Sequence, residues 1–360
     1  MHEKHLVREG LKLVLLLLVA GLAGWVFERM GSPLPWMIGP LVVTAALFMW
    51  SRFKLNVPNS MRPFGQVIVA CQVGLAFSPE AFRLLLELAP VIVGTALMTA
   101  IVIFGIAVVL SKTSQMTLSQ AFLASVPTSP IEAAAMAVRA GVDPMPVIFS
   151  QTLRLSAVVL ILPFTMYALE GWPEINRNYV TIEAFDLFNV LLVATLGIAA
   201  MLVFRLLRVP NPNFLGPLTL MAGLSVMAVA PSPFPAFILA LAQIILGTWL
   251  GSTFKRSLLT SAGRLTAACA FSILLVLVLC SAGAIGIAVL SGIDWHTTVL
   301  GAAPGGVVEM VLTAKFLGQN VALITAFHLT RIFVFMPNIP WIVRLISRRE
   351  NRIKFRGDHS

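Results

Sequence analysis

Charged residues are scarce in this sequence of 360 residues. Asp, Glu, Lys and Arg together account for 11% of the chain, whereas hydrophobic residues account for 58%. An average soluble domain is about one quarter charged, so this composition excludes a water-soluble globule. Several strongly apolar windows approach the roughly 20 residues that a helix needs to cross a bilayer. We therefore expect an all-α polytopic membrane protein.

The residues that hold metals are equally scarce. The sequence has three cysteines, which lie in apolar runs without metal-ligand spacing, and five histidines, most of which lie near the termini or in a polar loop. No cluster suits a copper or iron centre, and no phosphate loop, nucleophile elbow or other catalytic motif is present. We expect no metal, no cofactor and no enzymatic activity.

Acidic residues are outnumbered by basic ones, which gives the chain a net charge of +10. A basic chain can bind nucleic acid, but no basic stripe with interleaved aromatic residues accompanies the charge. The positive-inside rule explains the excess better, because basic residues gather in the cytoplasmic loops of membrane proteins. The expected partners are the lipid bilayer and a small-molecule substrate, with no direct nucleic acid binding and with a homo-oligomer left open.

What the sequence does contain is one stretch that occurs twice, in residues 127–154 (the first copy) and 304–331 (the second copy). Every residue of the first copy lies 177 positions before its partner in the second. A carboxylate and a guanidinium recur, and such charges are costly in hydrocarbon, so they indicate a functional site. The recurring pairs are Pro127 and Pro304, Glu132 and Glu309, Gly141 and Gly318, and Arg154 and Arg331.

The same offset extends over most of the chain. Residues 33–41 match residues 210–218 through two prolines, a Gly-Pro pair and a leucine, and Pro163 matches Pro340. Matched prolines and glycines are informative because each constrains or frees the backbone of its helix. We divide the chain into a first repeat at 1–169, a linker at 170–186, a second repeat at 187–346 and a basic tail at 347–360.

Each repeat offers five apolar spans and one ambiguous segment. In the first repeat the spans are near 10–28, 34–50, 61–78, 86–111 and 145–168, and the ambiguous segment is 119–140, with its counterpart at 296–317. Pro127 and Pro130 interrupt the first segment. Irregular backbone at membrane depth is tolerated only where protein or water satisfies it, which predicts a re-entrant hairpin or a broken helix. The alternative is a surface loop with an amphipathic helix.

The basic residues favour re-entry of the ambiguous segment. With five crossings per repeat, 18 Lys and Arg residues fall in the cytoplasm and three outside; if the segment crosses, the numbers are 14 and seven, with the four charges of the two copies left out. The first arrangement follows the positive-inside rule better. It predicts two inverted-topology repeats, about ten transmembrane helices and two re-entrant or broken hairpins, with both termini in the cytoplasm and the linker on the other side.

Paired broken segments in inverted repeats are the construction of secondary transporters, whose binding sites lie where half-helix ends meet. After the first break, at Thr128 and Ser129, and after the second, at Gly305 and Gly306, backbone N–H groups would favour an anionic ligand. The two glycines, which follow Pro304, allow close approach of a ligand. The sequence therefore places a candidate binding site at the two breaks.

Two further pairs of polar residues lie beyond the breaks. Gln151 and Arg154 in the first copy, and His328 and Arg331 in the second, are three residues apart, so each pair shares a helix face. A histidine among apolar residues is more often a satisfied core group than a switch. His328 nevertheless takes the place of a glutamine beside a recurring arginine, which favours a titratable group gained by one repeat.

The carboxylates are open to two interpretations, because each falls in the first turn after its break. There it either complements the helix dipole, alone or paired with an arginine, or takes part in binding. We expect the two copies to have unequal roles. Glu309, His328 and Arg331 are expected to carry binding or coupling, whereas Glu132 and Arg154 are expected mainly to hold the first repeat together.

The stretch PGGVVEM, the H-x-x-R of His328 and Arg331 and the earlier LPWMIGP make the sequence resemble the AbrB family of bacterial inner-membrane proteins over nearly the whole chain. This family is not the soluble DNA-binding regulator that shares its name. Its members have carried labels such as regulator of gene expression and ammonia monooxygenase, and the family is grouped with secondary transporters. The resemblance implies an inner-membrane location, which puts the linker in the periplasm. The first copy departs from the motif at the glycine tip and at Gln151, so it is expected to be mainly structural.

These observations favour a secondary transporter or exporter of a small anionic or zwitterionic metabolite, coupled to an ion or a proton. The alternative is a membrane sensor that affects gene expression indirectly, by binding its ligand at the same site without net flux. A monooxygenase is disfavoured because the sequence lacks a cluster of metal ligands.

Overall fold

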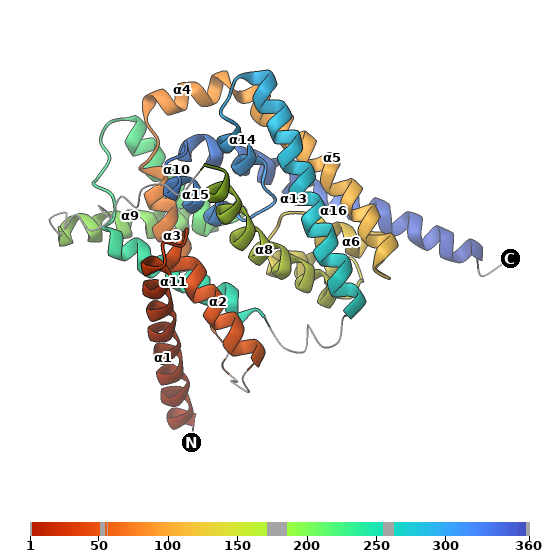
Figure 1. Ribbon diagram of the computed structural model, residues 1–360, viewed down its shortest axis with the longest axis horizontal. Helices are drawn as coiled ribbons and strands as arrows, with labels where there is room; N and C mark the ends of the chain where they lie inside the picture. Colours follow the sequence, from red (N-terminus) through yellow and green to blue (C-terminus); the bar gives the residue numbers. More distant parts are fainter. Residues whose placement is uncertain (1, 51–54, 56, 171–185, 255–262, 358–360) are drawn as a thin grey trace. The chain divides into compact units, whose positions relative to one another are not determined.

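The computed structural model of the protein describes residues 2–50, 55, 57–170, 186–254 and 263–357, without the side chains of residues 2–7, 170, 264 and 351–357. Every regular element within these residues is a helix (Figure 1), which confirms the expected all-α class. Residues 171–185 of the expected linker, and the side chains of most of the basic tail, lie outside the described part of the chain.

The bounds of the helices repeat at the offset found in the sequence. For α6 and α14, and again for α7 and α15, both ends differ by 177 positions. A further helix, α4 (Pro79–Glu87), corresponds to residues 256–264, which lie mostly outside the described part. The equivalent pairs are α1 (His2–Arg29) and α9 (Leu187–Leu206), α2 (Pro35–Trp50) and α10 (Pro212–Val226), α3 (Met61–Gly74) and α11 (Ala236–Ser252), α5 (Ala89–Thr113) and α13 (Gly263–Ser291), α6 (Leu118–Ser125) and α14 (Trp295–Ala302), α7 (Pro130–Arg139) and α15 (Val307–Phe316), and α8 (Pro144–Glu170) and α16 (Val321–Gly357).

Six helices of the described chain, namely α1, α5, α8, α9, α13 and α16, are long and apolar enough to cross a membrane. Helices α3 and α4, which meet at an angle of 90°, add a seventh if they count as one span. Helices α2 and α11 are apolar but have only 16 and 17 residues. At about 1.5 Å per residue they are shorter than a hydrocarbon layer of about 30 Å. A multi-pass helical protein is therefore supported, and the expected ten spans stay a prediction.

The chain folds into two compact units, and each unit combines segments of both repeats. Unit 1 consists of Met1–Leu84, Leu160–Arg256 and Val311–Ala322. Unit 2 consists of Leu85–Val159, Ser257–Met310 and Leu323–Ser360. The division of the sequence into repeats and the division of the fold into units are thus different. The two copies of the recurring stretch lie largely in unit 2.

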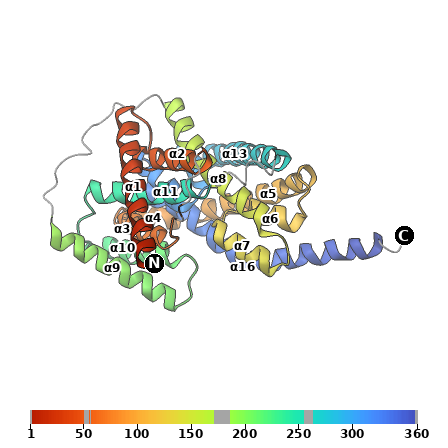
Figure 2. The same cartoon turned by 90° about the horizontal axis from the view of Figure 1, so that it is seen from below.

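In unit 1, helices of one repeat pack against helices of the other. Helix α2 packs on α11 and α3 packs on α10, while α1 lies beside α2 and α9 beside α10 (Figures 1 and 2). A Cβ on Gly251 of α11 would lie 2.6 Å from the carbonyl oxygen of Leu41 in α2, and a Cβ on Gly74 of α3 would lie 2.6 Å from that of Leu218 in α10. These two contacts are related by the 177-residue offset. Only glycine permits such a close approach of two helices.

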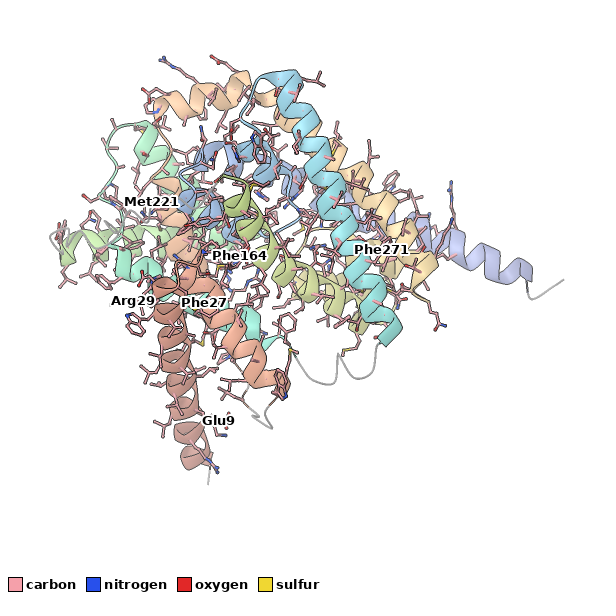
Figure 3. The ribbon with its side chains drawn as sticks, in the orientation of Figure 1. Glu9, Phe27, Arg29, Phe164, Met221 and Phe271 are labelled. Atoms are coloured by element: carbon pink, nitrogen blue, oxygen red, sulfur yellow. The ribbon has the colours of Figure 1, made fainter. Side chains whose placement is uncertain are left out.

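The helices separate into buried and exposed faces, as the side chains in Figure 3 illustrate. In unit 1, Met221 of α10 is fully buried, whereas in unit 2 Phe271 of α13 is 54% exposed. Large exposed apolar side chains suit contact with lipid rather than water. At the end of α1, the guanidinium of Arg29 lies 5.2 Å from the ring centre of Trp25. Such amphipathic side chains are typical of the ends of membrane spans.

In unit 2, α5 lies beside α13, and each is followed by one of the short helices, α6 and α14. One hydrophobic cluster joins the first broken segment to α16. It contains Phe122 and Val126 at the end of α6, Ala133 of α7, and Phe335 and Ile339 of α16. The first break is therefore held in the interior of unit 2.

Candidate functional site

Each ambiguous segment consists of two short helices separated by a break. Helix α6 has eight residues and α7 has ten, so neither crosses a bilayer alone. Val126, which ends α6, has φ −64° and ψ 133°, and Ala303, which ends α14, has φ −56° and ψ 134°. Both precede a proline, and a proline drives the residue before it out of the helical region. Pro127 and Pro304 thus end their helices at equivalent positions.

The broken segments are buried, which does not fit the alternative of a surface loop. In the first segment, Phe122 is 2% exposed and Val126 is fully buried. In the second, Leu300 is fully buried and Pro304 and Gly305 are also buried. Irregular backbone in such a place needs hydrogen-bond partners from the protein.

In the first copy, side chains of α8 supply these partners. The Nη1 group of Arg154 donates to the carbonyl oxygens of Ser125 (2.7 Å) and Val126 (3.1 Å). The Nε2 group of Gln151 donates to those of Leu123 (2.6 Å) and Val126 (2.8 Å). Arg154 Nη2 in turn donates to Gln151 Oε1 at 2.7 Å. The last carbonyls of a helix lack partners and carry its negative dipole end, so this pair caps α6.

The second copy repeats this arrangement with side chains of α16. Arg331 donates to the carbonyl oxygen of Ala303, and from Nη2 to that of Gly305 at 2.9 Å. His328 Nε2 lies 3.0 Å from the carbonyl oxygen of Leu300, and His328 Nδ1 lies 2.9 Å from Arg331 Nη2. The guanidinium and the ring therefore cap α14, as Arg154 and Gln151 cap α6.

These contacts define the protonation state of His328. A carbonyl oxygen only accepts and a guanidinium only donates. Nε2 must therefore carry the hydrogen that bonds Leu300, and Nδ1 must accept from Arg331. The ring is neutral. Gln151 makes the same two kinds of bond, with its amide donating and its oxygen accepting, and its amide also donates to Val126. Of the two side chains, only histidine can take up a proton.

The carboxylates lie at the other side of each break, where α7 and α15 begin. The backbone N–H of Glu132 donates to Ser129 Oγ at 3.2 Å, and the backbone N–H of Ser129 donates to the Glu132 carboxylate at 3.4 Å. This reciprocal pair is a capping box. In the second copy, the Glu309 carboxylate lies over Gly306, where it would touch any added Cβ. The carboxylates thus face the positive ends of their own helices.

The second break packs against the helix that carries Arg154. A Cβ on Gly305 would lie 2.8 Å from Val158 Cγ1 and 3.1 Å from Met310 Cγ. Val158 is one turn beyond Arg154 on the same face of α8. The positive charge of Arg331 also acts on Arg154. The two copies therefore meet within unit 2, with Gly305 and the two guanidinium groups at their junction.

Thr128 occupies the position equivalent to Gly305 and is 8% exposed. Its hydroxyl has no hydrogen-bond partner within the described residues, and neither has the Nε–H group of Arg154 or of Arg331. The candidate site thus contains residues of both copies, with three buried polar groups that have no partner in the described part of the chain.

Sequence reasoning missed the groups that hold the arginines, because these are backbone carbonyls. The one signal for them is the proline that ends each helix, since it implies unpaired carbonyls just before it. It also missed Val158, whose apolar run gives no sign of contact with a break. Within the described residues, no group of three His, Cys, Asp or Glu side chains could hold a metal ion.

Comparisons with known proteins identify a family and two similar proteins. The chain matches the model of a family described as "Transition state regulatory protein AbrB" over residues 2–129 and again over 36–347. The chain is similar to "Putative regulator AbrB" of Escherichia coli (strain K12), with 26% identity over 323 residues, 89% of this chain and 92% of that protein. It is also similar to "Uncharacterized protein YhjN" of Bacillus subtilis (strain 168), with 24% identity over 354 residues and 91% of each chain.

Proposed function

This chain belongs to the AbrB family, and on that premise we propose that it is a secondary transporter or exporter of a small anionic or zwitterionic metabolite, coupled to an ion or a proton. One observation carries the proposal: two helices are broken at equivalent positions, and a buried arginine is bonded to the carbonyl end of each. Paired broken helices form the binding sites of many secondary transporters, because their free ends can hold a ligand within the membrane.

The proposal includes a topology. The two repeats are inverted relative to one another and give about ten spans in a bacterial inner membrane. Both termini lie in the cytoplasm, and the linker lies in the periplasm. The distribution of basic residues supports it. A reporter fused at residue 172, in the linker, should give a periplasmic signal. A cytoplasmic signal there would remove the inverted arrangement.

Proton coupling would act through His328. In the structure, His328 Nδ1 accepts a hydrogen bond from Arg331. If Nδ1 took up a proton, it would become a donor and could no longer accept that bond. Uptake of a proton would therefore loosen the cap on α14. In this mechanism the first break, capped with Gln151, stays the same at every pH.

A membrane sensor is the second candidate. The name of the Escherichia coli relative, "Putative regulator AbrB", is the observation that favours it. A sensor would bind a ligand at the same breaks and move nothing. Both functions leave the ligand chemically unchanged and involve no direct contact with nucleic acid.

Flux measurements decide between the two candidates. The full-length protein is reconstituted in liposomes, and uptake of radiolabelled small organic acids and amino acids is followed with and without an imposed pH gradient. Empty liposomes give the background. A transporter shows saturable uptake of unchanged substrate and exchange with unlabelled substrate. Saturable binding without uptake in either direction would favour the sensor and reject transport.

A further inference from the structure

Two buried cations in unit 2 have no carboxylate partner among the residues that the structure describes. Arg154 is 2% exposed and Arg331 is 3% exposed. No ion pair joins either side chain to an acid within the described residues. The two charges also repel one another. Removing a cation from water costs several kcal/mol unless an opposite charge compensates it, so this pair needs a source of negative charge.

The helix ends supply part of that charge. Each guanidinium is bonded to the carbonyl end of a short helix, at Val126 and Ala303. A helix C-terminus carries about half of a negative charge. About half a positive charge per arginine is left, which makes about one positive charge for the pair. A ligand with a single negative charge would complete the balance.

The number of unsatisfied hydrogen-bond donors suits one carboxylate. Arg154 and Arg331 each keep one buried Nε–H group without a partner in the described protein, and the hydroxyl of Thr128 is a third such donor. A carboxylate has two oxygens and about four acceptor positions. It can therefore accept one N–H from each guanidinium and the O–H of the threonine. Hydrogen bonds of this kind, with charge on both sides, are the short and strong ones.

From these groups we propose that Arg154 and Arg331 bind one carboxylate between them, with the Thr128 hydroxyl as a third donor. The ligand is a small molecule with one carboxylate group and no second negative charge. A monocarboxylic acid and a zwitterionic amino acid share this chemistry. The proposal deepens the proposed function, since it names the substrate class, but as a statement about binding it holds for a transporter and for a sensor.

The first experiment measures binding to the purified full-length protein in nanodiscs at pH 7 and constant ionic strength. The ligands are propionate, L-alanine, succinate, chloride and choline, and the readouts are isothermal calorimetry and the unfolding temperature. Saturable binding of propionate or L-alanine is expected, and the two compounds distinguish a simple acid from a zwitterion. Succinate, chloride and choline should bind at least tenfold more weakly. Equal binding of chloride, or stronger binding of succinate, would overturn the proposal.

A matched pair of variants then tests the place of binding without breaking a cap. Thr128 and Thr152 are both buried, with hydroxyl groups that lack partners in the described residues. Thr152 lies on the side of α8 away from Arg154, two residues along the helix. Thr128→Val should weaken binding of the carboxylate about tenfold, the value of one hydrogen bond to a charged group. Thr152→Val should leave the affinity unchanged.

The outcomes distinguish a failure of this binding site from a failure of the proposed transport function. Binding of a monocarboxylate that is weakened only by Thr128→Val, with no flux, keeps the two-arginine site and rejects the transporter. Flux of a substrate without a carboxylate keeps the transporter and rejects the site. If no monocarboxylate or amino acid of the panel binds a protein that unfolds cooperatively, or if both threonine variants weaken binding equally, the site is not where we place it.

Discussion

The two breaks are held by similar hydrogen bonds from different residues. In both, an arginine holds the carbonyl end of a short helix and is itself bonded to the side chain three residues before it. That side chain is Gln151 in one and His328 in the other. The tip next to the break also differs, with Thr128 in one and Gly305 in the other. The arginines thus have a shared structural task, and specialisation is confined to the tip and to one titratable side chain.

Loss of either arginine should have the largest effect. Arg331→Gln removes the bonds to Ala303, Gly305 and His328. Arg154→Gln removes those to Ser125, Val126 and Gln151. A buried carbonyl that loses its donor costs about 1–3 kcal/mol, and each variant leaves more than one. Both variants should therefore lose most of their folded yield, as measured by fluorescence-detected size-exclusion chromatography.

Arg139→Gln is the control for this pair, because Arg139 is exposed at the end of α7. It should fold like the wild type. A result in which only Arg154→Gln fails to fold, while Arg331→Gln folds and loses binding, would support the expectation that the two copies have unequal roles.

Adding a methyl group at Gly305, next to the second break, should have the next largest effect. Gly305→Ala places a Cβ 2.8 Å from Val158 Cγ1, and overpacking of this kind costs about 1–3 kcal/mol. The double variant Gly305→Ala with Val158→Ala should recover part of the loss. Thr128→Ala, at the equivalent place, should change the unfolding temperature little. Equal losses for Gly305→Ala and Thr128→Ala would mean that the two tips are packed alike.

Exchange of the titratable side chain should affect the response to pH more than stability. His328→Gln copies the first break and should cost less than about 1 kcal/mol at pH 8, because the bonds are kept. The neutral ring is required by Arg331 on its own helix, and the other ionisable groups around this pair are Arg154 of α8 and Cys280 of α13.

The direction of the pH effect on stability follows from proton uptake by the unfolded chain. Below about pH 6.5 an unfolded histidine takes up a proton that the folded site disfavours. The wild type should therefore lose stability between pH 7 and 5, and His328→Gln should lose less, as measured by thermal unfolding in nanodiscs. Parallel pH profiles for the two proteins would exclude His328 as the group that senses pH.

The smallest effect is expected at the capping box of the first break. Ser129→Ala removes the acceptor of the Glu132 backbone N–H and should cost about 1 kcal/mol. Pro130, which follows directly, has no side-chain oxygen that could take over the cap. The second break has a glycine, Gly306, in the place of Ser129 and no such cap to lose. An unchanged unfolding temperature of the Ser129→Ala variant would show that Glu132 suffices for the helix end.

Much of the local structure was predictable from proline and glycine. Pro127 and Pro304 predicted the two breaks, and the 177-residue offset predicted equivalent helices on both sides of them. The carboxylates were expected in the first turn after each break, and Glu132 is found there in a capping box. Composition alone predicted the all-helical class.

The partners of the side chains were not predictable in the same way. Arg154 is bonded to carbonyls 28 and 29 residues before it, and a backbone carbonyl has the same chemistry at every position. The combination of both repeats in each compact unit also has no local signature, because it depends on packing between distant segments. The number of spans is not fixed either, since α2 and α11 are apolar but short.

The interlocked helices of unit 1 have a consequence for the order in which the protein is made. Helices α2 and α3 each make a close contact with a helix of the second repeat, at Gly251 and at Leu218 respectively. A ribosome delivers those partners more than 140 residues after the end of α3. The nascent first half must therefore wait in the membrane with two helix faces uncovered. The same faces would let two half-length chains pair with one another, so a protein of one repeat could be complete only as a dimer.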